Sequence, residues 1–151
     1  DYFVSLHRNT GEGNGVETWI RSDADDKAQS LAQNIMDNLD AAGVSRNRGV
    51  KKGTQKSESK DYYVNLHTNM PACIVELGFM NSPTDNQLFD ANLDSYAKAI
   101  GDAVLKTYES YGKDGTDATE SVEDVPSTED QTSTETGTGT TGQVLQNTQI
   151  L

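Results

Sequence analysis

The sequence lacks the features of several protein classes. One cysteine in 151 residues excludes an intrachain disulfide, although it does not exclude secretion. No apolar run approaches the roughly 18 residues that a membrane span needs, which argues against a membrane-spanning protein. Basic residues are also scarce, because 12 Lys and Arg stand against 24 Asp and Glu. This balance argues against a nucleic-acid partner, since binding to a phosphate backbone depends on clustered cations.

An initiating methionine is missing as well. The chain starts at Asp1, inside a segment that we expect to be a strand. We therefore predict that it is a fragment of a longer protein, and the absence of a signal peptide is then uninformative.

Composition divides the chain near Gly112. Residues 1–112 hold 16 acidic and 11 basic residues, a net charge of −5, and we predict one domain there. Residues 113–151 hold 8 acidic residues and 1 basic residue, a net charge of −7. Residues 113–142, rich in Asp, Glu, Ser, Thr and Gly, cannot bury enough apolar surface to fold, which predicts an acidic, disordered linker. Residues 143–151 regain apolar side chains and are either the start of a downstream module or a disordered tail.

The hydrophobic pattern predicts strands that alternate with helices. This alternation predicts an α/β fold: a layered, mostly parallel, twisted sheet flanked by helices, with its N-terminal part absent. We expect strands at residues 2–7, 16–20, 61–66 and 72–77. We expect one helix capped by Ser22-Asp23 and ended by Gly43, a second that starts at Ser82-Pro83, and a third over 92–111. The third helix should bury Leu93, Tyr96, Ala97, Ile100, Val104 and Tyr108.

Residues 44–60 are polar and contain two glycines, which predicts a loop. The loop holds the basic cluster of the chain, at Arg46, Arg48, Lys51 and Lys52. We interpret the cluster as solvated, and a surface that faces an anionic polymer is the alternative.

His7 and Glu76 are the strongest candidates for chemistry, because each is expected at the end of a buried strand. The carboxyl ends of strands are where ligands bind in open α/β sheets. The alternatives are a histidine satisfied by hydrogen bonds and a glutamate in a structural salt bridge. We favour function, because the Gly-rich loop 10–15 can admit a substrate and a buried carboxylate is costly unless paired or coordinated. A histidine and a glutamate on neighbouring strands are the parts of a zinc hydrolase.

Two rival sites carry less weight. Cys73 suggests a Cys–His hydrolase, which we reject because burial in an apolar strand raises the pKa of a thiol and suppresses the thiolate. Trp19 and the tyrosines suggest a sugar-stacking surface, but most of them occupy core spacings, so we interpret them as packing residues.

Five motifs follow one another through residues 1–112: Asp1-Tyr2-Phe3-Val4-Ser5-Leu6-His7-Arg8-Asn9, Gly15-Val16-Glu17, Arg48-Gly49-Val50-Lys51, Met70-Pro71-Ala72 and Val75-Glu76-Leu77-Gly78-Phe79-Met80-Asn81. In this order they resemble the motifs of zinc-dependent N-acetylmuramoyl-L-alanine amidases. The first resembles the third metal-ligand motif of that family. The resemblance therefore implies that the chain is the C-terminal part of the catalytic domain.

The resemblance implies a peptidoglycan hydrolase that cleaves the amide between the lactyl group of MurNAc and L-alanine of the stem peptide. His7 would be a Zn²⁺ ligand, and Glu76 would be the general base that activates water and later helps to protonate the leaving amine. Asn9, Glu17 and His67 are candidate substrate contacts. A structural hydrogen-bonder is the alternative for Asn9, a pair with a basic side chain is the alternative for Glu17, and a surface histidine is the alternative for His67. In the family, an upstream His and Glu complete the metal site, so this chain alone is expected to hold zinc weakly and to be inactive.

Three function classes follow from these observations. The first is a secreted amidase of the bacterial cell wall, an autolysin or a phage endolysin, with peptidoglycan as partner and a wall-binding module downstream. The second is a non-catalytic wall-binding or regulatory module that retains the fold without a complete metal site. The third is an α/β binding domain unrelated to cell walls, for which the string of motifs would be coincidence.

Overall fold

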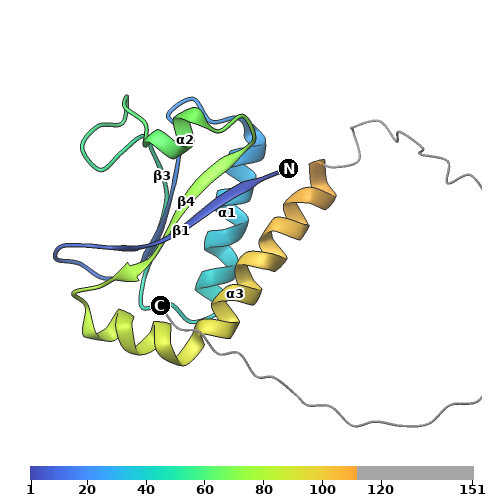
Figure 1. Ribbon diagram of the computed structural model, residues 1–151. Coiled ribbons are helices and arrows are strands. Elements are labelled where there is room, and N and C mark those ends of the chain that lie inside the picture. The colour runs from blue at the N-terminus through green and yellow to red at the C-terminus, as the bar shows by residue number, and fades with distance from the viewer. Residues whose placement is uncertain (112–151) are drawn as a thin grey trace, which may run out of the picture. The chain divides into compact units, whose positions relative to one another are not determined.

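A four-stranded sheet in the order β1-β4-β2-β3 forms the centre of the computed structural model (Figure 1). The strands are β1 (Phe3–Asn9), β2 (Val16–Ile20), β3 (Asn47–Lys52) and β4 (Ala72–Phe79). β1 runs parallel to β4 and β2 runs parallel to β3, whereas β2 and β4 are antiparallel. The expected α/β fold with a mostly parallel sheet is confirmed, and the antiparallel pair in the middle makes the sheet mixed.

The structure describes residues 1–111. The predicted linker at 113–142 and the segment 143–151 lie outside the described residues. Among the helices of the described part, none is long and apolar enough to cross a membrane.

Two helices cover one face of the sheet, α1 (Asp26–Ala41) and α3 (Pro83–Tyr111), and they pack against each other (Figure 1). Side chains alternate along a strand, so β4 points every second residue at these helices. Each fully buried Leu or Ile of this core contributes about 1.5–3 kcal/mol. The core contains Val16, Ile20, Leu31, Ala32, Ile35, Met36, Leu39, Cys73, Val75, Leu77, Tyr96, Ala99, Ile100 and Ala103.

The predicted N-cap of α1 is wrong, whereas its predicted C-terminal end is confirmed. Asp25, not Ser22-Asp23, is the N-cap, because its Oδ1 accepts a hydrogen bond from the Ala28 amide at 2.8 Å. Asp23 instead pairs with the Arg21 guanidinium, whose Nε lies 2.8 Å from its Oδ1. The predicted end at Gly43 is confirmed, since its φ of 89° is the left-handed conformation that glycine adopts after a helix.

The start of α3 at Ser82 and Pro83 is confirmed, and the Ser82 hydroxyl accepts a hydrogen bond from the Asp85 amide at 3.2 Å. A kink at Asn92 separates two helical segments, which matches the two helices expected there. The expected buried face is wrong for Leu93, Ala97 and Tyr108, which are all exposed. The buried stripe instead faces α1, where Asn34 and Asn38 donate hydrogen bonds to Thr107 and to the Ala99 carbonyl, each at 3.0 Å. It consists of Tyr96, Ala99, Ile100, Ala103 and Thr107.

Two expected segments are wrong. Residues 44–60 are not a continuous loop, because β3 pairs with β2 at the edge of the sheet. An edge strand with one solvated side tolerates the polar, Gly-containing sequence that hid it. Residues 61–66 are not a strand but contain α2 (Tyr63–His67), a helix of five residues. Its buried Asn65 donates a hydrogen bond from Nδ2 to the Trp19 carbonyl at 3.0 Å, a tertiary contact that no local pattern reveals.

Candidate functional site

Three polar side chains form a row across neighbouring strands. In the register of the sheet, His7 of β1 is paired with Glu76 of β4, and Glu76 is paired with Glu17 of β2. Residues paired in this way project from the same face of a sheet, and neighbouring strands lie about 4.8 Å apart. This face is opposite to the one that packs on α1 and α3, because the flanking Val75 and Leu77 belong to the core.

Glu76 has the least satisfied carboxyl of the row. Its Oε2 is buried and has no hydrogen-bond partner within residues 1–111. Burial raises the pKa of Glu76 above its ordinary value, the neighbouring His7 opposes this shift, and the charge of Glu17 adds to it. A half-buried carboxyl with a raised pKa on an open sheet face is suited to proton transfer.

His7 is exposed, and its Nε2 forms a hydrogen bond with the Ser5 hydroxyl at 2.8 Å. Serine and histidine are two residues apart on one strand, so both project from the open face. This contact orients the imidazole next to Glu76. A ring held by an outer hydrogen bond is typical of histidines that ligate metals.

The donors in this row fit part of a zinc site. His7 supplies an imidazole, and Glu76 supplies an unpartnered buried oxygen. Within residues 1–111, however, no three His, Cys, Asp or Glu side chains come together in a way that could hold a metal ion. Catalytic zinc usually has three protein ligands, so the described residues provide only part of such a set.

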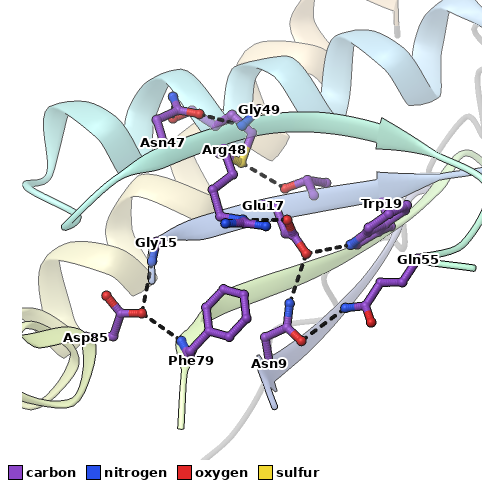
Figure 2. Close-up of polar contacts among 12 residues, drawn as sticks. Asn9, Gly15, Glu17, Trp19, Asn47, Arg48, Gly49, Gln55, Phe79 and Asp85 are labelled. Carbon is purple, nitrogen blue, oxygen red and sulfur yellow. Dashed lines mark hydrogen bonds and ion pairs between the residues drawn. The ribbon is translucent and has the colours of Figure 1, made fainter. Parts of the chain in front are cut away.

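Glu17 does not add a free donor to the row, because both of its oxygens are engaged (Figure 2). Its Oε1 accepts hydrogen bonds from Asn9 Nδ2 at 2.9 Å and Trp19 Nε1 at 3.1 Å. Its Oε2 forms an ion pair with Arg48 Nε at 2.7 Å. Glu17 is only 2% exposed, and this set of partners compensates the burial of its charge.

Asn9 is 5% exposed and connects Glu17 to the loop that follows β3. Its Oδ1 accepts hydrogen bonds from the Thr10 amide at 2.9 Å and from Gln55 Nε2 at 3.1 Å. Figure 2 shows Asn9 between Gln55 and Glu17. With Glu17, Arg48 and Gln55, Asn9 lines an open cleft of ≈ 440 Å³.

His67 lies outside this row. It is exposed at the end of α2, where its ring stacks on Tyr63 with centroids 4.0 Å apart. Its Nδ1 is 2.9 Å from the Tyr63 carbonyl oxygen. These contacts within a single helix account for its position as a surface histidine.

The sequence analysis missed the side chains that hold the site together. Arg48 was assigned to a solvated cluster, and its partner Glu17 is far away in sequence. Asp85, which follows the predicted helix start at Ser82-Pro83, is buried, and its Oδ2 accepts hydrogen bonds from the amides of Gly15 at 2.9 Å and Phe79 at 2.8 Å (Figure 2). Asp85 also accepts a hydrogen bond from the Ser45 hydroxyl. The only available signal for Asp85 was an acid close to an N-cap serine.

Cys73 is confirmed as a core residue. It is fully buried and faces the helices, on the other side of β4 from Glu76. Burial raises the pKa of its thiol to about 12. A Cys–His pair with His7 is therefore excluded by both geometry and ionisation.

An open sheet face that carries a histidine and a poorly solvated carboxyl is an arrangement suited to a hydrolase, and comparison with known proteins identifies the family. The model of the N-acetylmuramoyl-L-alanine amidase family matches residues 1–106. The chain therefore belongs to this family.

The chain is also similar to individual proteins of known sequence. The chain is 32% identical over 114 residues to "Uncharacterized protein YqiI" of Bacillus subtilis, covering 74% of this chain and 51% of that protein. It is 28% identical to "Probable cell wall amidase LytH" of Staphylococcus epidermidis, covering 74% of this chain and 35% of that protein. The chain thus spans about half or less of the length of these relatives.

Solved structures show the same fold. An N-acetylmuramoyl-L-alanine amidase from Clostridium difficile 630 superposes with a TM-score of 0.65 at 30% identity, over 74% of this chain and 60% of that one. Cwp6 from Clostridium difficile superposes with a TM-score of 0.63 at 29% identity, over 71% of this chain and 18% of that one.

Proposed function

We propose that this chain contributes His7 and Glu76 to the catalytic centre of a zinc-dependent peptidoglycan amidase. The reaction is hydrolysis of the amide between the lactyl group of MurNAc and L-alanine of the stem peptide. The observation that carries the proposal is the pairing of an exposed imidazole with a carboxyl whose buried Oε2 has no partner. Family membership supports it.

His7 would be one of the protein ligands of the metal, oriented by the Ser5 hydroxyl. A bound zinc ion supplies Lewis acidity, which polarises the scissile carbonyl and acidifies water. No group of three donors occurs among residues 1–111, and Glu76 is assigned the role of base, so the ligands besides His7 would come from elsewhere in the protein.

Glu76 would act as the general base. Its carboxylate takes a proton from the attacking water and later returns it to the nitrogen of the leaving alanine. Burial raises the pKa of this carboxyl, which strengthens it as a base and brings its proton affinity closer to that of its reaction partners. Glu17 stays bound to Arg48 and lies beside Glu76 without taking part in proton transfer.

The substrate places the protein in the bacterial cell wall, as a secreted autolysin or endolysin. The name of the related "Probable cell wall amidase LytH" supports this setting. A wall-binding module after residue 151 remains a prediction.

Glu76→Gln tests the function in the full-length gene product that contains this chain. With zinc present and purified peptidoglycan as substrate, we expect the release of stem peptide to fall by about 10²–10⁴-fold, the usual contribution of a general base. Glu109→Gln, an exposed glutamate on α3, is the matched control and should keep full activity. Full activity of the Glu76 variant would refute its role as the base.

The absence of a three-donor cluster among residues 1–111 also favours a second candidate. A non-catalytic wall-binding module would bind peptidoglycan, take up no zinc even as the full-length protein, and release no stem peptide. The same peptidoglycan assay on the unaltered full-length protein separates the two functions.

A further inference from the structure

Two residues of the basic cluster that the sequence suggested as a solvated loop, Arg48 and Lys51, lie on the same sheet face as Glu76. Lys51 of β3 is paired with Trp19 of β2, and Trp19 is paired with Ile74 of β4. Because Ile74 and Glu76 are two residues apart on one strand, all these side chains project from the open face. Arg48 reaches the same face through its ion pair with Glu17.

Two adjoining hollows run along β3, and we call them the β3 groove. One has a volume of ≈ 440 Å³ and the other of ≈ 650 Å³. They share Trp19, Lys51 and Gln55 as lining residues, and Arg48 lines the smaller one. The groove therefore begins beside the His7–Glu76–Glu17 row and continues past Lys51.

Contacts with Glu17 and Phe79 fix the position of the Arg48 guanidinium and leave part of it available to a ligand. Its recorded bond to Glu17 uses Nε, and the guanidinium lies 5.1 Å from the centre of the Phe79 ring. A guanidinium has five N–H donors, so this bond leaves the terminal amino groups to donate to a ligand. The side chain is 30% exposed and lines the groove, which gives a ligand access to it.

Lys51 lines both hollows and forms no ion pair within residues 1–111. The larger hollow is also lined by Lys52, Lys56 and Glu58. The exposed Glu12 lines the smaller hollow as well, so the charge there is mixed. Arg48 and Lys51 both lie on β3, and Arg48 already neutralises the charge of Glu17. The β3 side of the groove therefore favours the binding of an anionic group of a ligand.

The distance between Glu76 and the cations of β3 suits the substrate of an amidase. β3 lies two strands from β4, which is about 10 Å from the strand that bears Glu76. An extended peptide advances about 3.3–3.6 Å per residue. A side group on the second residue of the stem peptide therefore comes within reach of β3 when the amide before the first residue lies at Glu76.

We propose that Arg48 and Lys51 form a carboxylate-binding subsite for the residue that follows alanine in the stem peptide. The proposal rests on the proposed amidase function, which places the amide of alanine at His7 and Glu76. The subsite selects stem peptides in which this carboxyl is free over those in which it is amidated, because a charge-assisted hydrogen bond is lost in the amide.

The test measures binding to the full-length protein from which zinc has been removed by a chelator, so that hydrolysis does not enter. The two probes are MurNAc–L-Ala–D-Glu and its amide, MurNAc–L-Ala–D-isoglutamine, titrated by calorimetry or NMR. We expect the acid to bind at least about fivefold more tightly than the amide. Lys51→Gln should lower this ratio by at least about half, because one of the two cations is removed.

Matched variants separate the subsite from general charge effects. Lys106→Gln removes the same charge from an exposed position on α3 and should leave the ratio unchanged. Arg48→Lys keeps the charge beside Glu17 but loses the planar fork, so it should lower the ratio as well. Circular dichroism of each variant reports whether the fold is intact.

Three results would each overturn the subsite. The acid and the amide could bind with equal affinity, neither could bind, or Lys51→Gln could leave the ratio of their affinities unchanged. Failure of the full-length protein to release stem peptide would instead refute the amidase proposal, and it would leave the binding result as measured. The two failures are therefore distinguishable.

Discussion

At the scale of single residues, Glu76 should give the metal-free chain a distinctive pH dependence. Its folded-state pKa is raised by burial, so the folded state binds the proton more tightly than the unfolded state. This stabilising contribution is fully present below the unfolded pKa and is lost as pH rises through the raised folded pKa. Glu76→Gln removes that charge, and we expect the variant to be more stable than the parent at neutral pH.

Urea unfolding at pH values on both sides of the ordinary carboxyl range, about 4.3 in unfolded chains, measures this effect. The stability difference between Glu76→Gln and the parent should shrink towards acid pH, where Glu76 is protonated. Glu109→Gln serves as the exposed comparison. A difference that instead grows as the pH falls would contradict the raised pKa.

The Glu17–Arg48 pair should matter more for stability than an exposed pair does. Glu17→Gln leaves Arg48 with a partly buried charge, and we expect a loss of about 2–3 kcal/mol, below the ~3–5 kcal/mol of a fully buried pair because Arg48 retains solvent contact. Asp102→Asn, which breaks the exposed pair of Lys98 and Asp102 at 2.6 Å, should cost less than about 0.5 kcal/mol. Chemical unfolding of both variants gives the comparison, and equal losses would contradict it.

The sequence predicted His7 and Glu76 at the ends of two buried strands, because each polar residue follows an apolar run. That placement is wrong in detail, since His7 lies inside β1 (Phe3–Asn9), most of which is not buried, and Glu76 lies inside β4 (Ala72–Phe79). Their direct pairing across β1 and β4 was not predictable, since register depends on how distant segments align. The partnership of Glu17 with Arg48 was also hidden, because composition does not show which distant charges meet.

At the scale of elements, the reactivity of the Cys73 thiol reports whether β4 is buried in the core. Cys73 is fully buried and its thiol has a pKa of about 12, so an aromatic disulfide reagent at mildly alkaline pH should react far more slowly with the folded chain than with the urea-unfolded chain. Reaction in the folded state then reports opening of the sheet. Cys73→Ser should show no reaction, and equal rates with and without urea would contradict the position of β4 in the core.

The elements that the sequence predicted well are those with strong local signals. α1 ends at Gly43 and α3 begins at Ser82, where cap chemistry is read directly from the residue type. β3 and α2 were missed because pairing with β2 and the contact from Asn65 to Trp19 determine them. Tertiary contacts outweigh weak local preference in such short segments.

At the scale of the whole molecule, the metal site gives the sharpest test. His7 is the one expected ligand among the described residues, and no three-donor cluster occurs between residues 1 and 111. An imidazole and one carboxyl do not satisfy the usual tetrahedral zinc site. After dialysis against a weak chelator, we therefore expect this chain to retain almost no zinc, whereas the full-length protein should retain about one ion per chain.

Elemental analysis of the dialysed protein measures this content. In the full-length protein, His7→Ala should abolish zinc retention, whereas His67→Ala should leave it unchanged, because His67 stacks on Tyr63 outside the row. One tightly held zinc in the isolated chain would mean that these residues, or a second copy, complete the site, and the expectation of missing ligands would then be wrong. If the full-length His7→Ala protein retained zinc, His7 would not be a ligand. The role of Glu76 would be unaffected, because the activity of Glu76→Gln tests it separately.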